Sequence, residues 1–514
     1  MFDRNSLQNT VMGSASRVKL DETQSEDHCS DGIVDVHRTL GKLLSLSVAL
    51  VLRVIVARQP HSGEGTPPMY GDYEAQRHWM EVTWNLPVRD WYVNTTDNDL
   101  SYWGLDYPPL TAYHSFIMGG VAHHYVNPEF VALHTSRGME TEEHKFFMRA
   151  SVILADLLLY FPVLYLLFSD TTDLTILVAS TYPGLVLIDH GHFQYNSVSL
   201  GLVLLSFYLL TQHRWRDDMI LGSIAFVAAL NYKQMELYRS LPVFFFILGR
   251  CWQERSSVTG IRRLASVSLA VIFSFALIWL PFWSQPLQVL QRLFPFSRGI
   301  FEDKVANFWC TSSLVFKWKN AVSVHQLVTM CGLITLATSL PSCLHCFLRP
   351  TPRSFRWSLL IVSLCFYLFS YQVHEKSILI PASSALLLLT DHPQAICWFL
   401  STTCFSMTPL FIKEGLAPTF AFAMVIFLVY CVWFCHQSID FSWNAALSLP
   451  HVLAALSTTG SILLFLMMLF LKPPARYPHF LVVAMCSWCC THFLGFLMYF
   501  YSQQFASTDK IKVQ

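Results

Sequence analysis

Charged residues are scarce in this sequence: Asp, Glu, Lys and Arg make up 13% of its 514 residues, against the roughly 25% that is typical of soluble domains. Basic and acidic residues number 34 each, so no excess of positive charge points to nucleic acid. Hydrophobic residues make up 53%, and several apolar runs approach the roughly 20 residues that a helix needs to cross a bilayer. The composition therefore predicts an all-α, multi-pass protein embedded in membrane lipid, with no nucleic-acid partner.

The sequence also lacks a disulfide framework and the layout of a signal peptide. Most of the 14 cysteines sit inside apolar runs, where a free thiol behaves as a small hydrophobe. Two CxxC spacings occur, but no further metal or redox partners accompany them. The first apolar run starts only near Leu43, which does not fit a signal peptide. We expect residues 1–40, which are polar and without periodicity, to form a disordered tail.

Residues 41–514 are expected to form a single transmembrane domain with about 14 spans. The apolar runs lie at about 43–57, 147–168, 172–188, 197–212, 219–232, 239–250, 264–284, 323–347, 357–373, 378–391, 394–412, 418–435, 449–471 and 478–501. A long polar interval, residues 58–146, separates the first two runs. Within it, residues 110–126 are moderately apolar but contain three histidines, which favours an interfacial helix over a span.

Basic residues predict the orientation of the chain. Arg38 and Lys42 precede the first run, so the positive-inside rule places the N-terminus in the cytosol. Alternation then puts the arginine-rich loops between later runs on the same side, and an even number of spans returns the C-terminus to it. There the Lys-x-Lys-x-x ending resembles a retrieval signal to the endoplasmic reticulum. The interval 58–146 becomes the first lumenal loop, and its sequon at Asn94 is a predicted glycosylation site.

The same alternation places the most polar short motifs together on the lumenal side, at the ends of apolar runs. They are the first-loop acids Asp72 and Asp106, DHGHFQYN (Asp189–Asn196), NYKQMELY (Asn231–Tyr238), FSRGIFEDKVANFW (Phe296–Trp309) and QVHEKS (Gln372–Ser377). Ionisable groups at membrane depth are costly and are usually functional. Their shared side predicts one functional site on the lumenal face.

These residue types fit the transfer of a sugar from a lipid phosphate to a hydroxyl. A base must take the hydroxyl proton, and Asp72 is the candidate because a carboxylate is the usual choice. Positive groups must meet the charge that grows on the leaving phosphate, which suits Arg298 and Lys376. Lys233 and His374 are further candidates for this role. The alternative for Asp72 is a structural one, as the N-cap of the helix that follows.

A nucleotide-sugar donor predicts a different site, in which a DxD pair binds a divalent metal. Asp97 and Asp99 have this spacing, but they lie in a stretch dense in Asn, Asp and Thr, where turn formation explains them better. His190 and His192 form an HxH that lacks the further ligands of a zinc site. We therefore expect no metal and no other cofactor.

Seven motifs occur here in one order: GDYEAQRHW, YWGLDYPPLTAYHS, HTSRG, DHGHFQYNS, YKQM, FPFSRGIFEDKVANFW and VHEKSIL. With them the chain, from about Val51 to its end, resembles the dolichyl-phosphate-glucose-dependent α-1,3-glucosyltransferases of the endoplasmic reticulum. The resemblance implies a GT-C fold and an inverting, metal-independent transfer at a lumenal site. It also implies dolichyl phosphate glucose as donor and a nine-mannose dolichyl-diphosphate oligosaccharide as acceptor. Glu302–Trp309 is similar to the member that adds the first glucose; addition of the second glucose is the alternative.

The resemblance also implies roles for single residues. Asp72, in GDYEAQRHW, is the expected general base, and His374, in VHEKS, is expected near the donor phosphate. The motifs supply the other candidate substrate-binding residues: Glu74, Arg77, His78, Asp106, Asp189, His190, His192, Gln194, Lys233, Gln234, Arg298, Glu375 and Lys376. The alternative from another class is a multi-pass lipid or solute transporter. Against it, the two halves show no internal repeat, and the polar motifs sit at the ends of runs rather than at their centres.

Overall fold

The computed structural model describes residues 37–212, 218–254, 256–294, 304–438 and 449–506. Within these ranges every regular element is helical, which confirms the all-α prediction. The helix His37–Val56 begins inside the predicted tail, because Arg38 and Lys42 donate hydrogen bonds to the carbonyls of Thr171 and Ser169 and so order this turn. Residues 1–36 and the Lys-x-Lys ending lie outside the described residues.

The elements before the second apolar run are α2 (Gly71–Asn85), η1 (Val88–Asp90), α3 (Pro109–Val121), η2 (Ala122–Val126) and η3 (Pro128–Val131). The middle of the chain forms α4 (Glu142–Ala155), η4 (Asp156–Tyr160), α5 (Phe161–Leu167), α6 (Asp173–Ser180), α7 (Pro183–Val186), η5 (Leu187–Phe193), α8 (Asn196–Thr211), α9 (Asp218–Tyr232), η6 (Gln234–Arg239), α10 (Ser240–Trp252), α11 (Ser257–Trp279), η7 (Leu280–Phe282) and α12 (Pro286–Leu293). The last part forms α13 (Phe308–Ser312), α14 (Trp318–Ala321), α15 (Val324–Leu348), α16 (Pro352–Phe369), η8 (Glu375–Ile378), α17 (Leu379–Leu386), α18 (Pro393–Ser406), α19 (Thr408–Lys413), α20 (Ala417–Ser438), α22 (Leu449–Phe470) and α23 (Phe480–Ala506).

Each apolar run of the sequence coincides with one helix or with consecutive helices. Among the described residues, seven helices are long and apolar enough to cross a membrane: His37–Val56, Glu142–Leu167, Ser257–Phe282, Val324–Leu348, Ala417–Ser438, Leu449–Phe470 and Phe480–Ala506. A pair bent by 42°, Asp173–Ser180 with Pro183–Phe193, gives up to one more. The chain is therefore a multi-pass membrane protein, while the number of about 14 spans stays a prediction.

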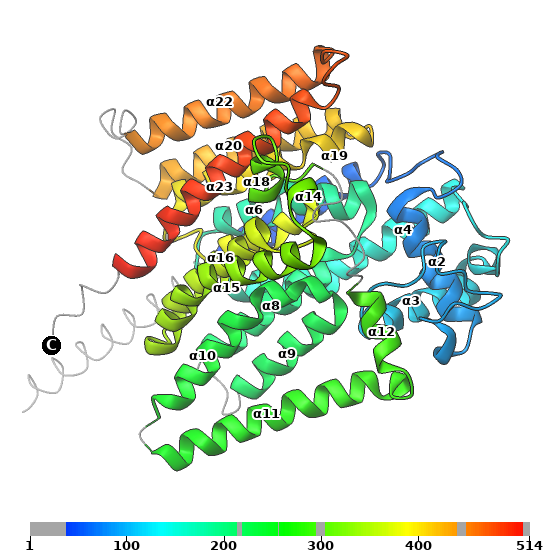
Figure 1. Cartoon of the computed structure of the whole chain (residues 1–514), viewed down its shortest axis with the longest axis horizontal. Helices are drawn as coiled ribbons and strands as arrows, with labels where there is room; N and C mark the ends of the chain where they lie inside the picture. Colours follow the sequence, from blue (N-terminus) through cyan, green and yellow to red (C-terminus); the bar gives the residue numbers. More distant parts are fainter. Residues whose placement is uncertain (1–36, 213–217, 255, 295–303, 439–448, 507–514) are drawn as a thin grey trace, which may run out of the picture.

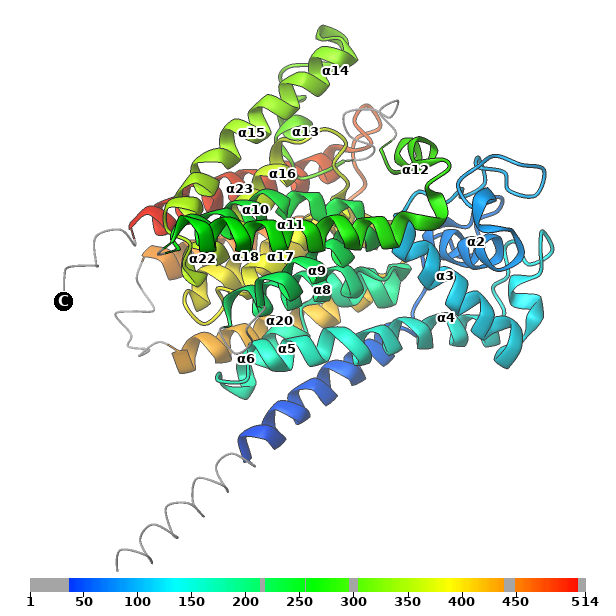
Figure 2. The same ribbon diagram turned by 90° about the horizontal axis from the view of Figure 1, so that it is seen from below.

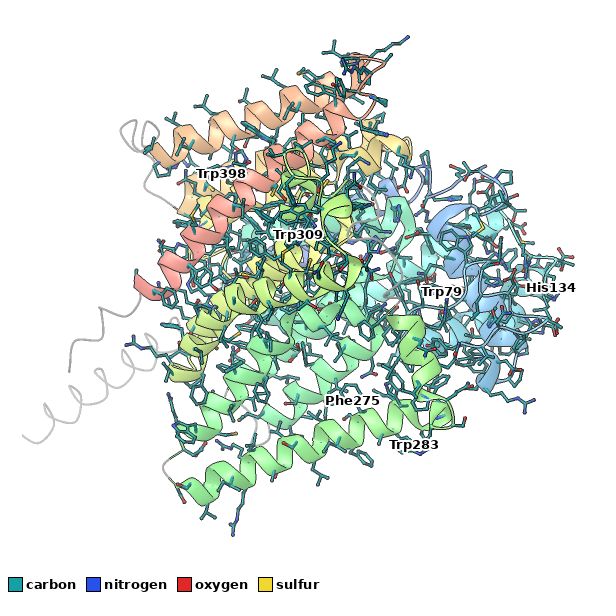
Figure 3. All side chains as sticks on the ribbon, in the orientation of Figure 1. Trp79, His134, Phe275, Trp283, Trp309 and Trp398 are labelled. Carbon is teal, nitrogen blue, oxygen red and sulfur yellow. The ribbon has the colours of Figure 1, made fainter. Side chains whose placement is uncertain are left out.

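The long helices pack into a bundle, and α2 and α3 gather at one end of it (Figures 1 and 2). We call residues 58–141, which contain both helices, the cap. Hydrogen bonds join the cap to the bundle: the Tyr113 hydroxyl donates to the Ile278 carbonyl over 2.8 Å, and Gln234 donates to the Asp106 carbonyl over 3.0 Å. Trp79 lies where the cap meets the bundle, whereas His134 lies at the outer rim of the cap (Figure 3).

Helix α16 is the centre of the bundle and ends directly before the VHEKS motif. Thr351 caps it, because its side chain accepts a hydrogen bond from Ser354 N, and Pro352 occupies its first position, where no backbone donor is needed. Nearly all of its residues are buried, including Trp357 and Tyr367. By contrast, only Gly260 and Val267 of α11 are buried, which fits a helix whose sides face lipid. The buried helix α16 thus ends where the VHEKS motif begins and positions this motif next to the cap.

Candidate active site

A cavity of about 910 Å³ opens between the cap and the end of the bundle. The predicted site residues that line it are Asp72, Asp106, His192, Gln194, Lys233, Gln234, His374, Glu375 and Lys376. They come from motifs that lie as far apart as the first loop and the turn after α16. The fold therefore brings these motifs together, as their shared side in the sequence predicted.

The start of α2 is fixed by two glycines. Two segments of the backbone cross closely here, one at Gly63 and one at Gly71, and both glycines have φ of +71°. A Cβ on either glycine would collide with the backbone of the other segment. Ser62, at this crossing, donates from its N–H to the His192 carbonyl over 3.1 Å and accepts from Asp72 N over 3.3 Å. Asp72 therefore lies in the first turn of α2, beside His192, and is not the N-cap of the helix.

His192 and Gln194 flank Phe193, a buried residue at φ +87°. Such a conformation costs on the order of 1–3 kcal/mol in a non-glycine residue and persists only where the surroundings impose it. The guanidinium of Arg149 lies 5.5 Å from the centre of the Phe193 ring and also donates to the Gly191 carbonyl over 2.9 Å. The strained turn at the end of η5 brings both polar side chains onto Asp72.

Positive φ at non-glycine residues clusters around this cavity. The described residues with this conformation are Tyr70, Trp103, His134, Phe193 and Gln372. Trp103 and Gln372 line the cavity, and Tyr70 and Phe193 each precede a lining residue. Strained backbone is typical of functional sites, where the geometry of the side chains outweighs its cost.

Asp72 is the centre of the polar contacts. Its Oδ2 accepts from Gln194 Nε2 over 2.6 Å and from Lys376 Nζ over 2.7 Å, and it lies 2.9 Å from His192 Nε2. Lys376 Nζ is also 3.0 Å from His192 Nε2. No described residue donates to Oδ1, and this oxygen is not buried. With a quarter of the side chain exposed, Oδ1 is the oxygen that faces the cavity.

The surroundings of Asp72 keep it ionised. Burial alone would raise the pKa of its carboxyl, but the positive charges and hydrogen bonds of Lys376 and His192 outweigh burial and hold this pKa well below its usual range. Behind it, Asn196 Nδ2 and Lys233 Nζ both donate to Gln194 Oε1, over 3.0 Å and 3.3 Å. The Gln194 amide is thereby oriented with its NH₂ toward Asp72.

A family model described as the ALG6, ALG8 glycosyltransferase family matches residues 49–500. The chain belongs to this family. A protein of Gallus gallus named dolichyl pyrophosphate Man9GlcNAc2 alpha-1,3-glucosyltransferase is 45% identical over 486 residues, with 89% of this chain and 95% of the relative covered. The protein of that name from Mus musculus is 43% identical over 482 residues, covering 88% and 94%. A probable enzyme of that name from Arabidopsis thaliana is 39% identical over 492 residues, covering 91% of each chain. The chain is thus a membrane glycosyltransferase of GT-C fold.

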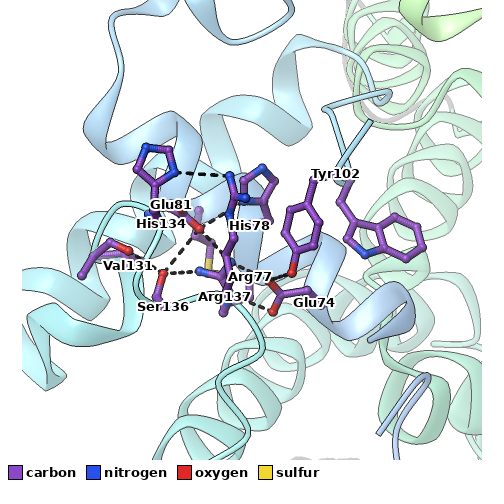
Figure 4. A network of polar contacts seen from close by, with 12 residues as sticks. Glu74, Arg77, His78, Glu81, Tyr102, Val131, His134, Ser136 and Arg137 are labelled. Atoms are coloured by element: carbon purple, nitrogen blue, oxygen red, sulfur yellow. Dashed lines mark hydrogen bonds and ion pairs between the residues drawn. The ribbon is translucent and has the colours of Figure 1, made fainter. Parts of the chain in front are cut away.

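Three predicted site residues of the glycosyltransferase, Glu74, Arg77 and His78, do not line the cavity. They belong to a network of polar contacts that Figure 4 shows. Arg77 Nη2 donates to Glu74 Oε1 over 2.6 Å and to Glu81 Oε2 over 2.7 Å. His78 Nδ1 is 3.1 Å from Glu81 Oε2, and the Tyr102 hydroxyl donates to Glu74 over 2.8 Å. These contacts hold the side chains to one another, and the substrate contact of Glu74, Arg77 and His78 stays a prediction.

Asp189 and His190 are also fully buried and do not line the cavity. Asp189 accepts from the backbone N–H groups of Asn196 (3.1 Å) and Ser197 (2.7 Å), so it caps the start of α8. His190 Nε2 lies 2.9 Å from Asp156, which also pairs with Arg53 inside the bundle. These contacts hold η5 in place, and substrate contact of Asp189 and His190 stays a prediction. Arg298 lies outside the described residues.

The cap residues with a predicted metal or glycan role have contacts within the cap. Asp99 accepts from Ser101 N over 2.9 Å, as expected for a turn residue, whereas Asp97 lies 3.1 Å from Nε2 of His134, 37 residues further along the chain. Within the described ranges, no three His, Cys, Asp or Glu side chains are grouped as metal ligands. Asn94 is exposed, so the sequon is accessible, and its glycosylation stays a prediction.

Sequence reasoning missed several cavity residues, above all Glu414, Asn196 and Arg292. Asn196 belongs to the DHGHFQYN motif and could have been included with Gln194. Glu414 belongs to no recognised motif, and its only sequence signal is an ionisable pair, Lys413-Glu414, at the end of an apolar run. A site residue that belongs to no motif can be recognised only from the tertiary structure, which shows that it lies in the cavity.

Proposed function

We propose that this glycosyltransferase moves glucose from dolichyl phosphate glucose to the nine-mannose dolichyl-diphosphate oligosaccharide, in α-1,3 linkage, as the first glucose added for protein N-glycosylation. Relatives named for α-1,3-glucosyl transfer onto Man9GlcNAc2 match about nine-tenths of the chain and support this substrate. The observation that carries the proposal is a carboxylate, Asp72, that is hydrogen-bonded to Lys376 beside other basic side chains in one cavity at the end of an apolar bundle.

Asp72 is the proposed general base. Its Oδ1 takes the proton of the acceptor hydroxyl while that oxygen bonds to the anomeric carbon of glucose. The bond from this carbon to the phosphate oxygen breaks at the same time, and dolichyl phosphate leaves with the electron pair. Attack from the side opposite the phosphate inverts a β-linked donor to an α product. The contacts to Oδ2 support this role because they fix the carboxylate and leave Oδ1 facing the cavity.

The donor phosphate is expected among the basic residues of the cavity: Lys376, Lys233, Arg292 and His374. Charge-assisted hydrogen bonds from such groups stabilise the leaving phosphate as its negative charge grows. Lys376 is paired with Asp72, and a phosphate beside it offers the ammonium a second anionic partner. Binding of the donor would then weaken the hold of Lys376 on Asp72 and make the carboxylate a stronger base.

The remaining parts of the proposal concern location and metal. We infer residence in the endoplasmic reticulum membrane, a lumenal active site and cytosolic termini, supported by the basic residues Arg38 and Lys42 at the start of the first helix. We also infer transfer without a metal cofactor. The contacts of Asp97 with His134 and of Asp99 with Ser101 support this inference, because they account for both residues of the DxD spacing.

The decisive experiment uses the purified full-length protein with synthetic dolichyl phosphate glucose. The nine-mannose acceptor and its mono-glucosylated product are offered separately, each with and without chelator. Transfer to the nine-mannose acceptor alone, unaffected by chelator, is the expected result. Transfer only to the glucosylated acceptor would identify the second reaction of the pathway instead, and no transfer by folded protein would overturn both assignments.

A further inference from the structure

His192 lies between two carboxylates. Its Nε2 faces Asp72 Oδ2 at 2.9 Å, and its Nδ1 lies 2.5 Å from Glu414 Oε1. Glu414 belongs to none of the sequence motifs. Its side chain is nonetheless buried beside His192, with only 7% exposed. The arrangement Glu414–His192–Asp72 places a second carboxylate directly behind the histidine that contacts the proposed base.

The backbone around Glu414 is built for this contact. Glu414 follows α19, and Gly415, at φ +73°, turns the chain so that Leu416 N can donate to the Phe411 carbonyl over 2.8 Å. Leu416 then packs against Gly191, where an added Cβ would come within 3.0 Å of its side chain. The absence of a side chain at Gly191 therefore lets the turn approach η5 closely and brings Glu414 to His192.

The contacts of Glu414 indicate that its carboxylate is the hydrogen-bond partner of His192. Its Oε1 is the atom at His192 Nδ1, and its Oε2 is buried without a hydrogen-bond partner among the described residues. A buried carboxylate oxygen without a partner is costly. The other charged groups facing His192 are Asp72, Lys376 and Arg149, the last through the Gly191 carbonyl. Glu414 is the one that contacts Nδ1.

This contact determines where the imidazole carries its proton. A carboxylate accepts hydrogen bonds but cannot donate, so Nδ1 must hold a hydrogen. Nε2 is then directed at Asp72 and Lys376, where it either donates to the carboxylate or accepts from the ammonium. In both states the ring keeps one orientation. An oriented histidine in turn keeps Asp72 Oδ2 engaged and Oδ1 turned to the cavity.

We propose that Glu414 is a positioning residue for glucosyl transfer, acting on the base Asp72 through His192. It fixes the tautomer and the orientation of the imidazole, as carboxylates behind histidines do in other sites. The proposal rests on the proposed role of Asp72, and it adds a residue that no motif of the sequence contains.

Glu414→Gln is the first test, because it keeps the size of the side chain. A glutamine can turn its NH₂ to Nδ1, which favours the opposite tautomer; in a serine-protease triad the equivalent change costs about 10⁴-fold in kcat. Substitution of a residue that orients another site residue typically lowers activity 10–100-fold, and we expect kcat of Glu414→Gln to fall by about that factor. The KM for dolichyl phosphate glucose should stay within about two-fold, because the proposed role of Glu414 is to orient His192 and not to bind the donor.

The matched control is Glu140→Gln. Glu140 lies 3.6 Å from His61 Nε2 in the cap and does not line the cavity, so the same chemical change beside another buried histidine should leave kcat unchanged. Donor binding and thermal unfolding in detergent are measured for both variants. A loss of activity in Glu414→Gln that is matched by a loss of donor binding would overturn the proposal. If this variant does not fold, Glu414→Asp replaces it, with a kcat expected below that of the wild type.

A double-mutant cycle separates action through His192 from any independent effect. His192→Gln and His192→Gln/Glu414→Gln should have the same kcat within about two-fold, because Glu414 has nothing to orient once the imidazole is gone. Additive losses would overturn the proposal. Asp72→Asn is assayed alongside: if it stays active, the base assignment fails. If it is inactive while Glu414→Gln is normal, only the positioning role of Glu414 fails.

Discussion

Two acidic residues of α2, Asp72 and Glu81, both have a basic and a histidine partner, yet their surroundings differ in kind. The partners of Asp72 come from η5 and from the turn after α16, and one of its oxygens faces the cavity. Glu81 is fully buried, and its partners Arg77 and His78 lie on its own helix. The charged group around Asp72 is open to the cavity and can therefore contact a substrate. The charged group around Glu81 is closed off from the cavity and can only stabilise the fold.

The electrostatics of the two sets are similar, so electrostatics alone does not separate them. Burial opposes ionisation of Glu81, but His78 and Arg77 outweigh it and lower the pKa of Glu81 to about 2. The pKa of Asp72 is lowered by the same kind of balance. A lowered pKa therefore marks a paired carboxylate in both places, and only access to the cavity identifies the reactive one.

The largest effect is expected from Asp72→Asn, which removes the base and leaves the shape of the site. Loss of a general base typically costs 10²–10⁴-fold, so turnover should fall by about that factor. The melting temperature should change little, because the amide can still accept from Gln194. Transfer rates and thermal unfolding of the same preparation measure the two quantities, and near-normal turnover would contradict the assignment.

Arg77→Met should have the opposite signature, with loss of stability and normal chemistry. Removal of one partner of a buried ion pair typically costs about 3–5 kcal/mol, because Glu74 and Glu81 keep uncompensated charge. Thermal unfolding and the yield of folded protein measure this, with Arg89→Met as the exposed control. A stable but inactive Arg77→Met protein would show that the closed network takes part in catalysis.

Lys376→Met tests the electrostatic link between the cavity charges through the pH profile. Because Lys376 holds the pKa of Asp72 low, the base form persists in the wild type until pH falls through that low value. Without Lys376, one of the two positive partners that oppose burial is gone, and this pKa rises. An ordinary carboxyl group has a pKa near 4, and burial raises that of Asp72 in the variant. We therefore expect kcat/KM of the variant to fall as the pH drops from 7 to about 5, whereas kcat/KM of the wild type should stay constant over this range. Parallel profiles would contradict the link.

The smallest effect is expected at the rim of the cap. Asp97→Ala/Asp99→Ala should reduce transfer by less than about two-fold, since both residues are exposed and their contacts, with His134 and Ser101, lie within the cap. Chelator should have no effect on this variant or on the wild type. Loss of activity in chelator that manganese restores would instead give these residues a metal-binding role.

Much of the fold could be predicted from the sequence, because apolar length and polar breaks are local properties. The helices fall at the predicted apolar runs, and residues 110–126 are helical as expected. The motif GDYEAQRHW, however, did not show which of its charged residues reach substrate. On a helix, Asp72 and Glu81 point to different sides, and only the packing of α2 on the bundle decides which side lines the cavity.

The sequence by itself determined the chemical type of this protein: a helical membrane bundle with a carboxylate and basic groups collected at one end. Hydropathy and motif composition carry that information, since burial in lipid and charge type depend on each residue alone. The tertiary structure decided which groups meet. Glu414 reaches His192, 222 residues earlier in the chain, because Leu416, after the turn at Gly415, packs against Gly191. Contacts of this kind depend on backbone approach in three dimensions, which no local pattern records.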